Sequence, residues 1–237
     1  MSELPRVHAI LGAHRSGTSW LAGSLEEKGL ELGEVNTAAR YNEKGNRESE
    51  RLWHVHEDML RVSGGSWRNP PTHVVASQHA LGELRAYIAE MDARYERWGF
   101  KDPRSLFVLD VWRELVPEGL GRVGIYRHPV AVASSLVARE PDVMDDESSA
   151  QLWLAYNERL VQEHQRDAFP ILRFDVDRDR LLRGLDAVAG VWALPHSDAP
   201  STFFESVLRH NDADARARVP ASCQRCWDYL EEHTLDV

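Results

Sequence analysis

The chain alternates short apolar runs with longer stretches in which apolar residues recur every three or four positions. Short apolar runs bounded by turn residues are typical of buried strands, whereas the longer spacing predicts helices with one apolar face. The pattern predicts strands at residues 6–11, 97–100, 120–126 and 170–174. It predicts helices at residues 17–29, 48–62, 79–95, 129–139, 147–165, 177–191 and 221–233, with a further helix that Pro103 starts at its first position.

Strands that alternate with helices call for a largely parallel sheet with both faces covered. We therefore expect an α/β fold, a three-layer sandwich in which helices flank a central, mostly parallel sheet of about four to five strands. No repeat, low-complexity tract or linker interrupts the pattern, so the expected organisation is a single domain over residues 1–237.

The first strand runs into a glycine loop that suits an anion. Gly12 and Gly17 are separated by four residues, and Thr18 and Ser19 follow at the start of a helix. Glycines let backbone N–H groups approach a phosphate, and the N-terminal end of the helix adds partial positive charge. The expected fold is therefore P-loop-like. Nucleotide triphosphatases carry lysine where this chain has Thr18, so the cation of the loop is Arg15.

Composition narrows the class of protein. Hydrophobic residues make up 43% of the chain and charged residues 28%, which is typical of a soluble globular protein. We expect no secretory signal, because the N-terminus has no long apolar run beyond Val7 to Leu11 and its neighbours, and no membrane span, because no apolar run reaches 18 residues. The two cysteines, Cys223 and Cys226, fit a reducing compartment and are expected to pack in a helix rather than bind zinc. A cytoplasmic location follows from these expectations.

The charged residues are unevenly distributed among types. The net charge of −10 gives no basic footprint for nucleic acid, so no nucleic-acid partner is expected. Lys28, Lys44 and Lys101 are the only lysines among the 28 lysine and arginine residues, and the others are arginines. Lysine is therefore the rarer choice in this chain, which makes the position of Lys101 after a predicted strand more informative.

Polar residues follow three of the predicted strands, and ligands of such sheets collect at the carboxyl ends of the strands. Lys101 to Arg104 follow the second strand, and Arg127 follows the third. The third segment reads Arg127-x-Pro129, with Ser135 about two turns into the next helix. An arginine fork suits bidentate contact with a phosphate, so this segment predicts a second anion site beside the glycine loop.

The two anion segments together resemble the cofactor motifs of sulfotransferases that use 3′-phosphoadenosine 5′-phosphosulfate (PAPS). The segment from His14 to Trp20 is similar to their 5′-phosphosulfate loop, and Arg127 with Ser135 is similar to their 3′-phosphate site. Asn42-x-Lys44-Gly45-x-x-Glu48, Lys101-Asp102-Pro103-Arg104 and Phe203-Phe204 to Leu208-Arg209-His210 resemble further segments of bacterial and tyrosyl-protein members. The resemblance extends from residue 7 to about residue 210.

The resemblance implies that PAPS is the donor and that no metal is needed. It implies donor-binding roles for Arg15, Ser16, Gly17, Thr18, Ser19, Trp20, Arg127 and Ser135, with Trp20 at a position where an aromatic ring stacks on adenine. Sulfuryl transfer needs an acceptor that loses its proton, in-line geometry and neutralisation of developing charge. Glu48 is the candidate base, and Arg15 and Lys101 are the candidate catalytic cations.

The chain departs from the family in two respects. The histidine base of many cytosolic members has no evident counterpart, and the late Arg-Lys-Gly motif is absent. If Glu48 is not the base, the alternatives are Glu43, Glu50, His54 and His56. Trp53 and Trp67 are candidate walls of an acceptor pocket. His14 and His128 flank the two anion sites. Arg104 has an alternative interpretation as a structural partner of Asp102, and Asp110 is interpreted as a surface helix residue rather than a magnesium ligand.

The sequence leaves the acceptor and two rival functions open. The expected acceptor is a hydroxyl or amine of a small molecule or carbohydrate, bound among loops 30–45, 63–78 and 140–150; the oligomeric state is undetermined. One rival is a small-molecule kinase that uses ATP and magnesium, against which the missing lysine at position 18 counts. The other is a non-catalytic nucleotide-binding protein of the same fold.

Overall fold

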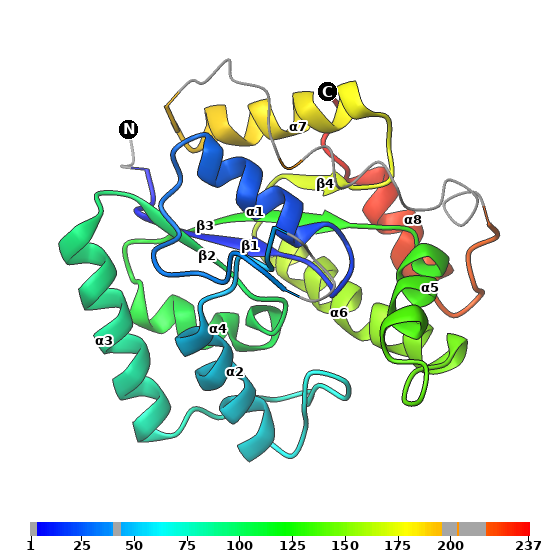
Figure 1. Cartoon of the computed structure of the whole chain (residues 1–237), viewed down its shortest axis with the longest axis horizontal. Helices are drawn as coiled ribbons and strands as arrows, with labels where there is room; N and C mark the ends of the chain where they lie inside the picture. The colour runs from blue at the N-terminus through cyan, green and yellow to red at the C-terminus, as the bar shows by residue number, and fades with distance from the viewer. Residues whose placement is uncertain (1–3, 40–43, 196–202, 204–216) are drawn as a thin grey trace.

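The computed structural model describes residues 4–39, 44–195, 203 and 217–237 (Figure 1). Its elements in chain order are β1 (Val7–Leu11), α1 (Thr18–Glu27), α2 (Glu50–Val62), α3 (Gln78–Arg94), β2 (Trp98–Lys101), α4 (Ser105–Leu115), β3 (Leu120–Tyr126), α5 (Pro129–Arg139), α6 (Asp146–Arg166), β4 (Ile171–Arg173), α7 (Arg178–Val191) and α8 (Gln224–Glu232).

The four strands form one parallel sheet in the order β2-β1-β3-β4. In its register, Ile10 of β1 pairs with Lys101 of β2 on one side and with Val123 of β3 on the other. The carboxyl ends of β1, β2 and β3 therefore lie side by side, and the segments that follow them meet at one edge of the sheet.

Helices cover both faces of this sheet (Figure 1). One core cluster joins α1 and α7 to the sheet, with Leu25 and Leu185 among its members. The other joins the opposite face to α2, α3, α4, α6 and α8, with Trp112 and Trp153 among its largest side chains. Because both faces are covered, β1 is buried at every position, as its uninterrupted apolar run predicts. The expected three-layer α/β sandwich with a four-stranded parallel sheet is confirmed.

Local sequence signals explain most boundaries of the elements. The predicted strand at 120–126 and the predicted helix at 129–139 agree with β3 and α5, which has Pro129 in its first turn. Ser77, Asp145 and Asp177 cap the starts of α3, α6 and α7 with side-chain hydrogen bonds to backbone N–H groups. The expectation for Pro103 is wrong: α4 begins at Ser105, because a turn closed by the Ser105 N–H and the Asp102 carbonyl oxygen precedes it.

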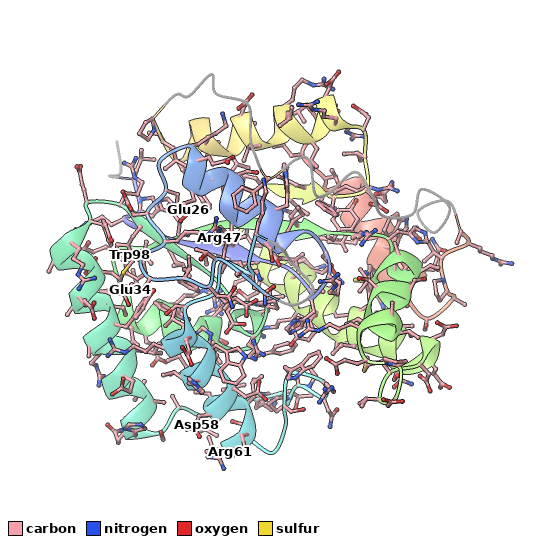
Figure 2. All side chains as sticks on the ribbon, in the orientation of Figure 1. Glu26, Glu34, Arg47, Asp58, Arg61 and Trp98 are labelled. Carbon is pink, nitrogen blue, oxygen red and sulfur yellow. The ribbon has the colours of Figure 1, made fainter. Side chains whose placement is uncertain are left out.

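The segment before α2 is held in place by hydrogen bonds within itself and by an ion pair with α1. The Asn36 N–H donates to the Glu48 carbonyl oxygen at 3.0 Å, and the Arg47 N–H donates to the Asn36 carbonyl oxygen at 3.1 Å. Arg47 also forms an ion pair with Glu26 of α1 at 3.2 Å, and Figure 2 labels both side chains. These contacts fix the backbone of Glu48 at the entrance to α2.

Two expectations concern the end of the chain and the membrane. Of the late segment from Phe203 to His210, only Phe203 lies within the described residues, where its ring is buried against Gly23 of α1. Asn42 and Glu43 likewise lie outside the described residues. Among the helices that the structure describes, none combines the length and the apolar character that crossing a bilayer requires.

Candidate functional site

The glycine loop between β1 and α1 is shaped by close backbone contacts. A Cβ atom on Gly12 would lie 2.3 Å from the carbonyl oxygen of Ile125, so only glycine lets the loop pass this close to β3. Gly17 has a φ of 91°, and a Cβ atom there would lie 2.2 Å from the Phe174 ring. Arg15 also has a positive φ, of 65°. The loop is therefore a constrained turn whose backbone is shaped before any ligand arrives.

Side chains of the loop differ in their exposure. Ser16 and Thr18 are buried, and the Ser16 hydroxyl has no hydrogen-bond partner among the described residues. Arg15, Gly17 and Ser19 are partly exposed. The side chains that can reach a ligand from the surface of the loop are accordingly Arg15 and Ser19, while Thr18 packs beneath the loop beside Gly12.

The structure brings the two predicted anion motifs into contact. The Arg15 Nε donates to the Ser135 Oγ at 2.8 Å, although 120 positions separate them in the chain. Arg127 lies at the end of β3, where the Trp153 indole N–H donates to its carbonyl oxygen at 2.9 Å. Burial, followed by the charges of Arg139 and Arg127, lowers the pKa of Arg15. Such crowding of cations is what an oxyanion would relieve.

Arg139 joins this group, and sequence reasoning missed it. It follows Ser135 by four residues on α5 and therefore lies on the same helical face. Its charge acts on Arg15 and also on His14. A cation four residues after a predicted phosphate-contacting serine is a signal that the sequence contained. Arg15, Ser135, Arg127 and Arg139 are called the arginine cluster below.

Phe174, rather than Trp20, presents an aromatic ring at the glycine loop. Trp20 is only 4% exposed and belongs to the core between α1, α7 and the sheet. Phe174 follows β4, is partly exposed, and packs against Gly17. The Arg127 guanidinium lies 5.7 Å from the centroid of the Phe174 ring. The centroids of the Trp20 and Phe174 rings are 6.1 Å apart. Core packing therefore covers Trp20, and Phe174 is the aromatic residue that lies at the loop.

Glu48 and Lys101 form the second part of the site. The Lys101 Nζ donates to the Glu48 Oε1 at 2.5 Å. Lys101 is 4% exposed, and the Glu48 side chain is 15% exposed. Lys101 ends β2 in register with Ile10, immediately before the glycine loop, so the pair lies beside that loop. A carboxylate in this position is a candidate general base, and the lysine that contacts it is a candidate donor to a reacting oxygen.

A network of buried polar groups lies behind Lys101. The His56 Nδ1 contacts the Asp102 Oδ2 at 2.9 Å, and the Arg104 Nη1 donates to the Asp102 Oδ1 at 2.8 Å. Arg104 Nε also donates to Glu57 at 2.6 Å. Burial by itself raises the pKa of Asp102, but the neighbouring Arg104 and His56 hold this pKa well below its usual range. The interpretation of Arg104 as a structural partner of Asp102 is confirmed.

A wall of aromatic rings stands beside the loop and this network. The Tyr156 hydroxyl donates to the Trp67 carbonyl oxygen at 2.9 Å and lies 3.2 Å from the His14 Nε2. Since the hydroxyl proton is used, His14 donates from Nε2. The Trp67 ring is centred 4.7 Å from the His14 ring, and Arg68 forms an ion pair with Glu140 at the end of α5. Segment 63–71 is thus fastened over the glycine loop and α5.

The remaining candidates fall into three groups. Glu50 and His54 lie on the exposed face of α2, with side-chain exposures of 89% and 62%, so neither points into the site. Trp53 is partly exposed, and the Arg104 guanidinium lies 5.4 Å from its ring. His128 caps α5 through Nδ1, and burial lowers its pKa.

Two further sequence interpretations are confirmed by position. Asp110 lies on the surface of α4, where it pairs with Arg113, Arg159 and Arg166. Cys223 and Cys226 lie in the core beside α6 and α8, and both are free thiols. Neither feature contributes to the site.

Comparisons with known proteins agree with this architecture. No protein-family model matches the sequence, and the curated proteins contain no significant match. Among solved structures, the fold is similar to the sulfotransferase domain of the olefin synthase of Synechococcus PCC 7002, with a TM-score of 0.55, 17% identity, and coverage of 99% of this chain and 97% of that one. It is also similar to the sulfotransferase STF1 of Mycobacterium tuberculosis H37Rv, with a TM-score of 0.50, 14% identity, and coverage of 95% and 77%. The chain has the sulfotransferase fold.

Proposed function

We propose that the protein is a sulfotransferase that moves a sulfuryl group from PAPS to a hydroxyl or amine of a small molecule or carbohydrate. The observation that carries the proposal is the Arg15–Ser135 hydrogen bond, which joins the glycine loop to the arginine cluster beside the Glu48–Lys101 pair. A donor with phosphate-type groups at both ends requires two adjoining anion sites. The fold supports the same activity.

The residues present suit such a donor. The arginine cluster gathers three guanidinium groups. Burial, and then the charges of Arg139 and Arg127, lower the pKa of Arg15, so an added oxyanion would stabilise the cluster. Arg127 and Ser135 would hold the 3′-phosphate, with Arg139 beside them. Ser16 to Ser19 would hold the 5′-phosphosulfate through the glycine loop. Phe174 would face the adenine in place of Trp20.

The reaction is divided among three side chains. PAPS, when bound, would supply the sulfuryl group. Glu48 would take the proton of the acceptor hydroxyl, because Lys101 holds its carboxylate beside the glycine loop. Lys101 and Arg15 would donate hydrogen bonds to oxygens on which negative charge develops, and both are held before the reaction by Glu48 and Ser135. The aromatic wall with Trp67 would exclude water from the acceptor side. A cytoplasmic location accompanies this proposal.

Calorimetry with the desulfated product, 3′-phosphoadenosine 5′-phosphate (PAP), tests the donor. PAP should bind, and Arg127→Ala should weaken PAP by about tenfold or more, since a charge-assisted bidentate contact is lost. The same change should affect adenosine 5′-phosphate by less than about twofold, because that ligand lacks the 3′-phosphate.

Other outcomes would favour the rivals. Equal losses for PAP and adenosine 5′-phosphate would remove the 3′-phosphate assignment. Tight binding of ATP–magnesium with no binding of PAP would favour a kinase. Binding of PAP without transfer of labelled sulfate to any acceptor in a broad screen of hydroxyl and amine compounds would favour a non-catalytic nucleotide-binding protein.

A further inference from the structure

His56 is fully buried in the middle of α2, and its two hydrogen bonds indicate which ring nitrogen donates and which accepts. The Trp112 indole N–H, which can only donate, lies 3.0 Å from the His56 Nε2. Nε2 must therefore accept, and the ring proton is on Nδ1, which donates to the Asp102 Oδ2 at 2.9 Å. His56 is 0% exposed and Asp102 is 1% exposed. The His56 ring therefore connects Trp112 of α4 to Asp102 in the segment after β2.

Two consecutive residues of α2 grip that segment. His56 contacts Asp102, and the adjacent Glu57 accepts from the Arg104 Nε at 2.6 Å. Arg104 closes the arrangement, because its N–H and its Nη1 donate to the Asp102 Oδ1 at 3.0 and 2.8 Å. Movement of α2 along or around its axis would break both contacts, and Asp102 is too deeply buried for water to replace the lost donor at little cost.

The same two elements carry the Glu48–Lys101 pair. Lys101 immediately precedes Asp102 at the end of β2, and Glu48 lies one residue before Ser49, the N-cap of α2. The position of α2 relative to β2 therefore sets the separation of the Glu48 Oε1 from the Lys101 Nζ, which is 2.5 Å. We propose that His56, through Asp102, is a positioning residue that holds Glu48 against Lys101. Its catalytic meaning rests on the proposed function.

Two substitutions separate positioning from packing. His56→Leu fills much of the space but removes the donor to Asp102 and leaves the Trp112 N–H without its acceptor. His56→Asn supplies an amide N–H near the position of Nδ1, so it should keep the contact with Asp102 although it is smaller. If His56 matters only as core filling, the smaller asparagine should disturb the protein at least as much as leucine.

The three lysines of the chain make the pair directly observable. With lysine labelled at ¹³Cε, NMR should show three side-chain signals, and Lys101→Arg identifies the one from Lys101. Glu48→Gln defines the position of that signal when the partner charge is lost. We expect His56→Leu to move the signal toward its Glu48→Gln position and His56→Asn to leave it near the wild-type position. An unmoved signal in a folded His56→Leu protein would overturn the proposal.

Asp102→Asn provides a second test if His56→Leu does not fold. His56 and Arg104 contact different oxygens of the carboxylate, and an amide keeps an acceptor oxygen at only one of these two positions. The Lys101 signal should again move toward its Glu48→Gln position. A folded Asp102→Asn protein with an unmoved Lys101 signal would overturn the proposal equally.

Transfer measurements connect the geometry to the reaction. Release of labelled sulfate from PAPS, with water as the probe acceptor, should fall about tenfold in His56→Leu, whereas the Kd for PAP should stay within about twofold. In the Glu48→Gln background His56→Leu should have no further effect on the rate, since both act through one pair. Additive rate losses would contradict action through Glu48. Failure of the wild type to bind PAP would instead overturn the proposed function and leave the Lys101 result standing.

Discussion

Gly17 and Phe174 show how much of the site depends on the absence of a single atom. Gly17 has a left-handed φ of 91°, and its missing Cβ leaves the space that the Phe174 ring fills. The same ring lies beneath the Arg127 guanidinium. Any side chain at position 17 would therefore strain the loop and displace the ring on which Arg127 rests.

Substitution of glycine by alanine should have opposite effects at two positions. Gly17→Ala should destabilise the protein by about 1–3 kcal/mol, from positive φ and a contact of 2.2 Å with Phe174, and should weaken PAP binding. Gly82→Ala, in the exposed face of α3 with nothing within 4 Å of its new Cβ, should stabilise by about 0.5–1 kcal/mol. Urea unfolding measures the change in stability of each variant, and calorimetry measures its binding of PAP. Equal effects of the two substitutions would contradict the special role given to the backbone of Gly17.

At the scale of the element, α5 arranges three successive polar contacts along one helix. Its N-cap follows Arg127, Ser135 lies in its second turn, and Arg139 lies one turn later on the same face. Glu140 then ends the helix and pairs with Arg68, which ties segment 63–71 to this end of the site. The helical spacing of α5 therefore fixes the relative positions of these side chains at the proposed anion site.

Arg139→Gln should weaken PAP binding by about tenfold, because one of three clustered guanidinium groups is lost. The loss should shrink as salt concentration rises, since the attraction is electrostatic. Arg61→Gln is the matched control: Arg61 is 71% exposed, pairs with Asp58 at the far end of α2 (Figure 2), and should leave PAP affinity unchanged. Isothermal calorimetry at two salt concentrations makes the comparison. An effect of equal size for both variants would indicate general electrostatics instead of a site.

At the scale of the whole molecule, the closed layers bury titratable groups that have no role at the site. His8 of β1 is 0% exposed and packs against Trp192, with ring centroids 4.3 Å apart and ring planes tilted by 35°. It also lies against Gly121 of the neighbouring strand β3. Burial lowers its pKa to about 4 from a usual value of 6.5. The folded protein therefore keeps His8 neutral in a pH range where the unfolded chain takes up a proton.

This difference makes stability depend on pH in one direction. Above pH 6.5 His8 is neutral in both states and contributes no pH dependence; as the pH falls from 6.5 toward 4, only the unfolded chain binds the proton and stability is lost. The total loss is about 3 kcal/mol at about 1.4 kcal/mol per pKa unit. His8→Leu should therefore flatten the profile of unfolding free energy between pH 7 and 4.5, while His79→Leu, at an exposed position, should run parallel to the wild type. Parallel profiles for the wild type and both variants would contradict the contribution of His8 to the pH dependence of stability.

Much of the fold was determined by the sequence alone. The order of strands and helices, the three-layer arrangement and most boundaries follow from apolar periodicity and capping residues, which depend on neighbours along the chain. The spacing of Gly12 and Gly17 predicts the loop, and the spacing of Arg127 at a strand end and Ser135 about two turns into the next helix predicts a second anion site beside it. Their roles toward a donor, and those of Glu48 and Lys101, stay predictions.

Only the tertiary structure decided which distant side chains meet. Periodicity does not tell that Arg15 reaches Ser135, that the charge of Arg139 acts on Arg15, or that His56 contacts Asp102. Trp20 lies in a sequence segment typical of a ligand contact, yet packing of α1 on α7 covers it and leaves the ring of Phe174 at the loop. The reason is that secondary structure is set by local spacing, whereas burial and contact at the glycine loop are set by elements more than a hundred residues away.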